Sequence, residues 1–248
     1  MKKKKPLLPL LLMLLPLGII LSVAYTAYQA TQPSEQEIPG YRVSGQDVSK
    51  LPDSDSTEDY LDKLHGPLLG NRHLGDAEAR QRLLRTQRFL EGSVGFGNMD
   101  YQPEKIAVDE ELASLLLVIP GEKQTAGAIL VSVAFDNPPG QDLLSDAASV
   151  TLLLETAHSL AGPIPPRTVY LAFLADDEEL ARVDALIRRR EDLPLWQHLH
   201  YLGERSPPST MPPEVTLRRH TFPGDAGQEV TPLVQLAINL RQELMTTR

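Results

Sequence analysis

The sequence predicts an α/β domain with a largely parallel central sheet. Three short apolar runs, at residues 113–119, 128–135 and 167–175, are bounded by turn residues and have the composition of buried strands. Segments with helical periodicity alternate with these runs along the chain. Strands that alternate with helices pair in parallel, and the helices cover both faces of the sheet. We therefore expect a three-layer sandwich.

Capping residues mark the ends of the first two helices that we expect. The helix over residues 77–91 follows Asp76, whose carboxylate can cap it, and ends at Gly92. The helix over residues 146–161 follows Ser145, which we expect at the N-cap position. Both helices carry an apolar face that can cover the sheet.

The remaining elements lie in the carboxyl-terminal third of the chain. A charged amphipathic helix is expected over residues 177–190, and short strands over 199–202 and 215–217. A last helix has Thr231 at its N-cap and runs to about Met245. In parallel sheets, ligands bind beyond the carboxyl ends of the strands, so chemistry is expected among the residues that follow each strand.

The N-terminal segment, residues 1–30, has the pattern of a membrane anchor. Lysines at positions 2–5 precede an uncharged, mostly apolar run over residues 6–25, and about 20 such residues cross a bilayer as a helix. The lysines favour a cytoplasmic N-terminus, which puts the rest of the chain outside the cytoplasm, in the periplasm or the extracellular space. A cleaved signal peptide is the alternative. Its apolar region is long and its cleavage site at 22–24 is a poor one, so we favour a single-pass anchor.

Composition bounds the rest of the chain. Residues 31–60 are rich in Ser, Pro, Gln, Asp and Glu, which predicts a flexible acidic linker before a folded domain over 61–248. The net charge is −9. Four of the basic residues belong to the N-terminal lysine run, so the rest of the chain is more acidic than this value. Nucleic-acid binding is excluded, because it needs clustered Lys and Arg. The chain has no cysteine, which excludes disulfides, thiol nucleophiles and cysteine-bound zinc.

Carboxylates and imidazoles supply the candidate functional groups. The carboxylates near strand ends or helix starts are Asp136, Asp146, Asp176, Asp177, Glu178 and Glu179. They can bind a metal or act as a base, although the helix dipole alone favours acidic residues in a first turn. His220 is expected in a loop before the last helix, where a histidine is a ligand, an acid–base group or simply solvated. His198 and His200 are two residues apart and share one side of a strand.

Five short motifs occur in order between residues 65 and 180. They are Gly70-Asn71-Arg72, Val118-Ile119-Pro120-Gly121, Val133-Ala134-Phe135-Asp136, Ser145-Asp146-Ala147-Ala148-Ser149-Val150 and Ala175-Asp176-Asp177. Their order and spacing resemble the zinc-dependent exopeptidase family, which contains bacterial leucyl aminopeptidases, glutaminyl cyclases and non-catalytic relatives such as nicastrin. The resemblance implies that family's sandwich fold for the domain.

The resemblance also implies where a zinc site would lie and how far it has degraded. In the family, a His-x-Asp motif and an Asp-Asp turn supply zinc ligands, and a Glu-Glu pair supplies the general base and a further ligand. Here Ala134 and Ser145 occupy two of the ligand positions. Alanine has no donor atom, and a hydroxyl is a poor substitute for a bridging carboxylate. The Glu-Glu pair aligns with Asp176 at the base position and Asp177 at the ligand position, or with residues 178–179 if two residues are inserted.

The vestigial ligand candidates that remain are Asp136, Asp177, His200 and His220. His200 aligns with an aspartate ligand of the family and His220 with its last histidine ligand. A catalytic zinc normally has three protein ligands and a water. The resemblance therefore implies a site that no longer holds a metal, and no cofactor is expected.

Two functions follow from these observations. The first is a membrane-anchored, extracytoplasmic, exopeptidase-like domain that is not catalytic and works by binding a protein or peptide or within an assembly. The alternative is an active zinc aminopeptidase with a rearranged site built from Asp136, Asp177, His200 and His220. Zinc would be the cofactor only under the second interpretation.

Overall fold

A computed structural model describes residues 41–44, 46–66, 70–123, 127–203, 216–220 and 230–247. The predicted anchor, residues 1–30, lies outside these ranges, as does the predicted linker up to residue 40. Among the described residues, no helix has the length and apolar character to cross a bilayer.

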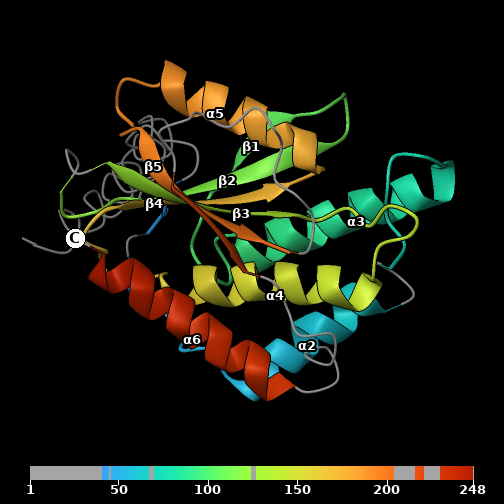
Figure 1. Ribbon diagram of the computed structural model, residues 1–248, viewed down its shortest axis with the longest axis horizontal. Coiled ribbons are helices and arrows are strands. Elements are labelled where there is room, and N and C mark those ends of the chain that lie inside the picture. The colour runs from blue at the N-terminus through green and yellow to red at the C-terminus, as the bar shows by residue number, and fades with distance from the viewer. Residues whose placement is uncertain are drawn as a thin grey trace, which may run out of the picture. The chain divides into compact units, whose positions relative to one another are not determined.

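The described domain contains a six-stranded sheet with helices on both faces (Figure 1). The strands are β1 Glu104–Ala107, β2 Ala113–Ile119, β3 Ala128–Ala134, β4 Thr168–Leu174, β5 Trp196–Leu202 and β6 Thr216–His220. The α-helices are α2 Ser54–His65, α3 Ala77–Val94, α4 Leu143–Ser159, α5 Leu180–Arg189 and α6 Val230–Thr246. A short 3₁₀ helix, η1 Asp177–Glu179, precedes α5.

The strand order is β1-β2-β4-β3-β5-β6. Strands β4, β3, β5 and β6 are mutually parallel, whereas β2 runs antiparallel to both β1 and β4. The expected α/β class and mostly parallel sheet are therefore confirmed.

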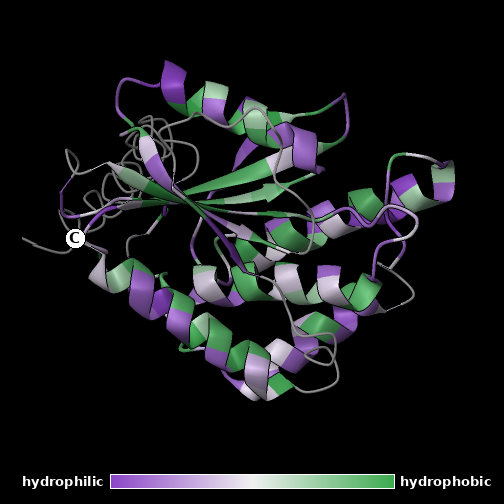
Figure 2. Cartoon of the chain, viewed as in Figure 1, coloured by the Kyte–Doolittle hydropathy of each residue, from purple (hydrophilic) through white to green (hydrophobic). Residues whose placement is uncertain are grey.

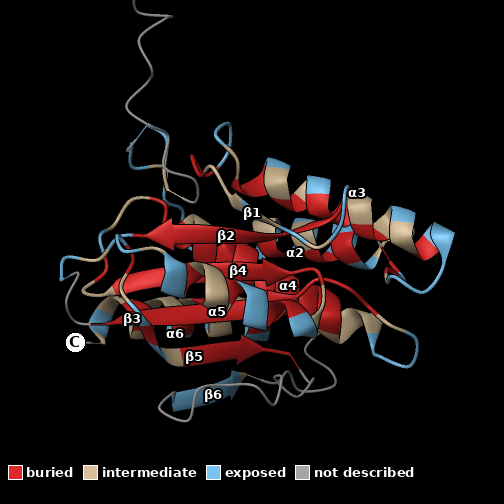
Figure 3. Ribbon diagram, turned by 90° about the horizontal axis from the view of Figure 1, so that it is seen from above, coloured by how far each residue is buried: buried red, intermediate tan, exposed pale blue. Residues whose placement is uncertain are grey.

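Burial explains why the central strands are apolar throughout. Every residue of β2, β3 and β4 is buried, because helices cover both faces of the sheet. Residues such as Leu130 and Tyr170 face α5, while Val131 and Phe173 face the helices of the other side. Figure 2 shows the hydrophobic colouring concentrated along these strands. In Figure 3, by contrast, β6 is exposed at the edge of the sheet.

Two layers of helices cover the face opposite α5. Helices α3 and α4 pack on the sheet, α6 packs beside α4, and α2 packs on α4 and α6. Helices therefore cover both faces of the sheet, as the prediction of a sandwich requires, and α2 adds a further layer that was not predicted.

The prediction of a linker up to residue 60 was wrong at its end, because α2 begins at Ser54. Asp53 caps this helix by accepting a hydrogen bond from the Ser56 amide. Only Leu61 and Leu64 supply large buried apolar side chains, so the acidic composition concealed the helix.

Several predicted helix ends also need correction. Helix α3 starts after Asp76 as expected but continues past Gly92 to Val94. A Cβ atom at Gly92 would meet nothing within 4 Å, so close packing does not require a glycine here. Relative to alanine, the glycine lowers helix stability by about 1 kcal/mol. Burial of Val94 offsets that cost. Helix α4 begins at Leu143 with Asp142 as its cap, which places Ser145 inside the first turn.

The carboxyl-terminal elements differ from prediction in similar ways. Strand β5 begins at Trp196, and His220 ends strand β6 instead of lying in a loop. Thr231 lies inside α6. Strand β1, Glu104–Ala107, was not predicted, because it is a short edge strand of mixed polarity.

One buried carboxyl group yields a stability prediction. Glu155 of α4 is 1% exposed, and burial raises its pKa, although the Ser56 hydroxyl and Lys50 oppose the rise. A carboxyl pKa raised in the folded state favours folding at low pH, and this contribution is lost as the pH rises through the folded pKa. We expect Glu155→Gln to increase the free energy of unfolding above that pH, because the amide is never charged and its burial does not have to desolvate a carboxylate.

Urea denaturation at pH 4.5 and pH 8 tests this prediction. The advantage of Glu155→Gln should grow with pH, whereas Glu58→Gln, on the exposed side of α2, should show no such trend. An equal difference from the parent chain at both pH values would contradict the prediction.

Candidate functional site

The candidate site lies where β3 and β4 end side by side. Ala134 of β3 pairs with Leu174 of β4 in the parallel register. The residues that follow both strands, and the first turn of α4, therefore meet at one edge of the sheet. Ligands bind at this edge in parallel α/β folds.

Arg72 fixes the loop that borders this edge. Its side chain is fully buried, and it donates hydrogen bonds to the backbone oxygen of Phe135 and, at 3.0 Å, to that of Leu64. The Asn137 amide donates to the Arg72 backbone oxygen. One arginine thus joins the 70–76 loop, the end of α2 and the end of β3.

Asp136 and its neighbours are buried beside this arginine. Asp136 is 7% exposed and Asn137 is 3% exposed. The Asn137 side-chain amide donates to the Asp146 carboxylate of α4 at 2.5 Å. Asp146 thus orients the loop after β3.

Asp176 and Asp177 are both engaged by their surroundings. Asp176 caps η1 by accepting from the amides of Glu178 at 2.8 Å and Glu179 at 3.2 Å. The Tyr201 hydroxyl of β5 donates a hydrogen bond to the Asp177 carboxylate. Asp176, which the resemblance aligns with the base position, thus serves as a helix cap. Asp177 is held by a tyrosine on the α5 side of the sheet.

His200 and His220 form a pair across β5 and β6. His200 Nδ1 lies 3.0 Å from His220 Nε2, and the two rings are stacked with centroids 5.2 Å apart. His200 is 3% exposed. Burial lowers the pKa of His200 to about 4, with smaller contributions from His220 and Arg218. Burial and Arg218 also lower the pKa of His220, so at neutral pH one uncharged imidazole donates to the other. His198, on the same strand, is half-buried.

The pair predicts an acid-sensitive fold. The unfolded state takes up a proton on His200 near pH 6.5, whereas the folded state does so only near pH 4. Stability should therefore fall as the pH drops from about 6.5 to 4. An NMR titration should place the His200 midpoint near 4, and the variant His200→Gln should lose less stability over the same interval. A midpoint near 6.5 would contradict the buried pair.

The resemblance marks Ala134 and Ser145 as positions where the family has zinc ligands and this chain does not. Ala134 is buried in the cluster beneath α5. The Ser145 hydroxyl is buried in the first turn of α4 and makes no hydrogen bond within the described residues.

A zinc ion requires a set of donor side chains around one point. No three carboxylate or imidazole side chains in the described part of the chain lie close enough to hold one. Asp177 contacts Tyr201, and His200 contacts His220.

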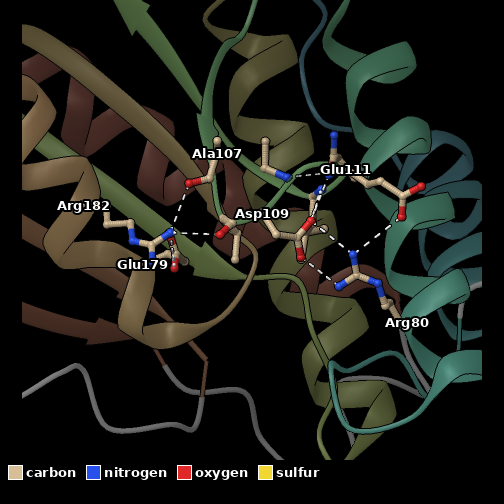
Figure 4. Close-up of polar contacts among 10 residues, drawn as sticks. Arg80, Ala107, Asp109, Glu111, Glu179 and Arg182 are labelled. Carbon is tan, nitrogen blue, oxygen red and sulfur yellow. Dashed lines mark hydrogen bonds and ion pairs between the residues drawn. The ribbon is translucent and has the colours of Figure 1, made fainter.

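In the alternative alignment, the Glu-Glu pair of the family corresponds to residues 178–179. Glu178 is exposed, whereas Glu179 is 4% exposed and burial raises its pKa. Arg182 lies 3.3 Å from the Glu179 carboxylate and also donates to the backbone oxygens of Ala107 and Val108 (Figure 4). Glu179 therefore helps to hold the β1–β2 turn against α5.

A second arginine holds the same turn from α3. Arg80 donates two hydrogen bonds to Asp109, at 2.8 and 3.1 Å, and lies 3.6 Å from Glu111 (Figure 4). This contact holds the pKa of Asp109 well below its usual range. Because β2 is antiparallel to β4, the turn lies at the same edge as the candidate site. The two arginines give that edge a fixed border.

A cavity that the sequence reasoning did not predict opens beside this edge. It has a volume of about 330 Å³ and lies between the 71–76 loop, the start of α3 and the loop after β3. Asn71 and His73, which flank Arg72, both line it. The Gly70-Asn71-Arg72 motif was the available signal, since it is followed by a histidine and a helix cap.

Comparisons with known proteins complete the description. No protein family matches the sequence, and no curated protein is significantly similar to it. Solved structures that are similar include LapB from Legionella pneumophila, with 16% identity over 61% of this chain and 43% of that chain, at a TM-score of 0.44. Glutaminyl cyclase from Fimbriiglobus ruber has 13% identity over 62% of each chain, at a TM-score of 0.43.

Human carnosine dipeptidase 1 is also similar, with 8% identity over 60% of this chain and 38% of that chain, at a TM-score of 0.44. This chain thus spans less than half of the length of LapB and of the human dipeptidase.

Proposed function

We propose that this chain is an exopeptidase-like domain without catalytic activity, which works by binding a protein or peptide. The observation that carries the proposal is the engagement of three of the four ligand candidates by one another and by a tyrosine. His200 binds His220, and Asp177 binds Tyr201. Each contact uses donor or acceptor atoms that a metal ion would require.

The two lost positions support the same conclusion. Ala134 provides no donor atom, and its side chain is part of the packed cluster beneath α5. The carboxylate of Asp176, at the base position, accepts hydrogen bonds from two backbone amides. A general base must instead lie within hydrogen-bond reach of the proton that it removes. The edge therefore keeps the scaffold of a site without the groups that hydrolysis needs.

The N-terminal sequence pattern supports a membrane context for this domain. The proposal includes a single-pass anchor through residues 6–25, with the domain outside the cytoplasm. Anchoring explains why a domain without catalytic groups is useful, since it would concentrate a partner at the membrane surface. Fractionation of cells that express the full-length chain and a chain lacking residues 1–30 tests this part. The full-length chain should remain with the membrane after alkaline extraction, and the shortened one should not.

Peptide hydrolysis tests the proposed absence of catalysis. The full-length chain, supplied with zinc, should release no more product from leucine p-nitroanilide than the same buffer without protein. His220→Ala and Asp177→Ala should give the same rate as the parent chain. Zinc-dependent release that either substitution abolishes would support the active peptidase instead, with Asp136, Asp177, His200 and His220 as its ligands.

A further inference from the structure

Helices α2 and α3 form one exposed surface on the side of the sheet opposite α5 (Figure 1). Both helices pack on α4. Between them, the rings of Tyr60 and Phe89 meet edge to face with centroids 6.2 Å apart. Lys63 Nζ also lies 6.0 Å from the Phe89 centroid. Both rings are half-buried. They mark a seam, with α2 exposed on one side of it and α3 on the other.

The exposed face of α2 is acidic. Asp55, Glu58 and Asp62 are spaced three and four residues apart, which puts them on one side of the helix, and all three are exposed. A fourth carboxylate, Asp59, is already paired with Lys63 at 2.6 Å. Within the described ranges, no cationic side chain lies at ion-pair distance from the first three.

The exposed face of α3 is basic beside the seam. Arg85 and Arg88 are exposed and lie within about one turn of Phe89. The other two arginines of the helix, Arg80 and Arg82, are paired with carboxylates of the chain itself. Arg85 and Arg88 form no such pair in the part of the chain that the structure describes. The surface therefore has an acidic half on α2 and a basic half on α3.

Gly92 leaves open space in the basic half. It follows Arg88 by about one turn and is exposed, and a Cβ atom there would meet nothing within 4 Å. Glycine lowers helix stability relative to alanine, and no contact among the described residues requires it. A position without a side chain lets another backbone approach closely. This position therefore favours a solid neighbour, such as a second helix.

We propose that two copies of this chain associate through this surface, with α2 of each copy lying against α3 of the other. A two-fold axis along the seam places the acidic half of one copy on the basic half of its partner, and the reverse. Such an axis also keeps each residue at its position along the seam, so the neighbours of Tyr60 meet those of Phe89. An axis across the seam would instead bring like charges together. The inference goes beyond the proposed function, since a dimer can form with or without catalysis.

The contacts that would hold this dimer are individually weak. Exposed ion pairs contribute little each and are screened by salt, while aromatic side chains at the centre of an interface contribute more. We therefore expect a dimer that dissociates on dilution and at high salt. Copies of a chain with a net charge of −9 repel one another overall, so stronger association at low salt would require matched halves.

Sedimentation velocity of the full-length chain in a nonionic detergent, at low and high salt, tests the dimer. The parent chain should associate at low salt and be monomeric at high salt. Arg85→Glu with Arg88→Glu makes both halves acidic, and Glu58→Lys with Asp62→Lys makes the acidic half basic. Each double variant should associate at least about tenfold more weakly than the parent chain. A chain with all four substitutions should associate again, because its two halves are exchanged.

Two further variants locate the contact. Arg189→Glu, at an exposed position of α5 on the opposite face of the sheet, is the matched control and should leave association unchanged. Gly92→Leu changes no charge and should weaken association, because it fills the open space on α3.

Three outcomes would overturn the proposal. The first is a parent chain that unfolds cooperatively but stays monomeric at low salt, which would leave the two helices to a different partner or to none. The second is association that the charge variants or Gly92→Leu leave unchanged. The third is a fourfold variant that stays monomeric although it folds. None of these outcomes concerns zinc or hydrolysis, so the proposed function is tested separately.

Discussion

Replacement of Arg72 with methionine is expected to lower the free energy of unfolding by about 3 kcal/mol. The substitution keeps most of the side-chain volume but removes the hydrogen bonds to Leu64 and Phe135. Arg72 is fully buried, so both carbonyl oxygens would lose their donor away from water. A buried group left unpaired costs roughly 1–3 kcal/mol. This is the largest effect that we expect from a single polar residue.

Urea denaturation measures this loss, with Arg88→Met on the exposed face of α3 as the matched control. The control should change stability by less than about 0.5 kcal/mol. A loss below about 1 kcal/mol in Arg72→Met would show that Arg72 does not hold the loop, the end of α2 and β3 together.

Replacement of Asp100 with alanine is expected to cost about 2 kcal/mol and to release the N-terminal strap, residues 41–44 and 46–50. Asp100 is 2% exposed. Its carboxylate accepts from the Ser44 amide at 3.0 Å and from the Ser44 hydroxyl at 2.7 Å. Its φ of 65° is left-handed, a conformation that Asp and Asn tolerate better than alanine.

Asp100→Asn is the matched variant. It keeps an acceptor oxygen and the tolerance for a left-handed backbone, so it should lose less stability than Asp100→Ala. Limited proteolysis should cleave within the strap faster in Asp100→Ala than in Asp100→Asn. Equal cleavage rates in the parent chain and both variants would show that the strap is held by other contacts, such as the bond from the Val48 amide to the Ala161 oxygen.

The elements with the strongest local signals were predictable from sequence. The runs at β2, β3 and β4 are apolar because both faces of the sheet are covered, and a continuous apolar run of that length indicates such a strand. Asp76 was identifiable as a cap because it directly precedes the helix. Its carboxylate accepts a hydrogen bond from the third helical amide.

Other features depend on contacts that a linear pattern does not contain. Helix α2 is stable because Leu61 and Leu64 meet the helices below the sheet, although its surroundings in the sequence are acidic. Asp142 outcompetes Ser145 as the cap of α4, because its carboxylate reaches the amides of both Leu144 and Ser145. His220 was expected in a loop, and only the pairing of β6 with β5 places it beside His200.

The candidate site was predictable in its location but not in its contacts. The residues after β3 and β4 do meet at one edge, as parallel strands require. The bond between Tyr201 and Asp177 could not be foreseen, since the two residues are 24 positions apart in the sequence and meet only in the folded sheet. The cavity was missed because its lining combines residues between 71 and 82 with Asn137 and Pro139, which are far away in the sequence.

The zinc content of the full-length chain tests the central claim most directly. The chain should be purified without a metal-binding tag, dialysed against zinc-free buffer and analysed by atomic emission. We expect far less than one zinc ion per chain, and the same value for His220→Ala and Asp177→Ala. One zinc ion per chain that survives dialysis, and that either substitution removes, would contradict the account.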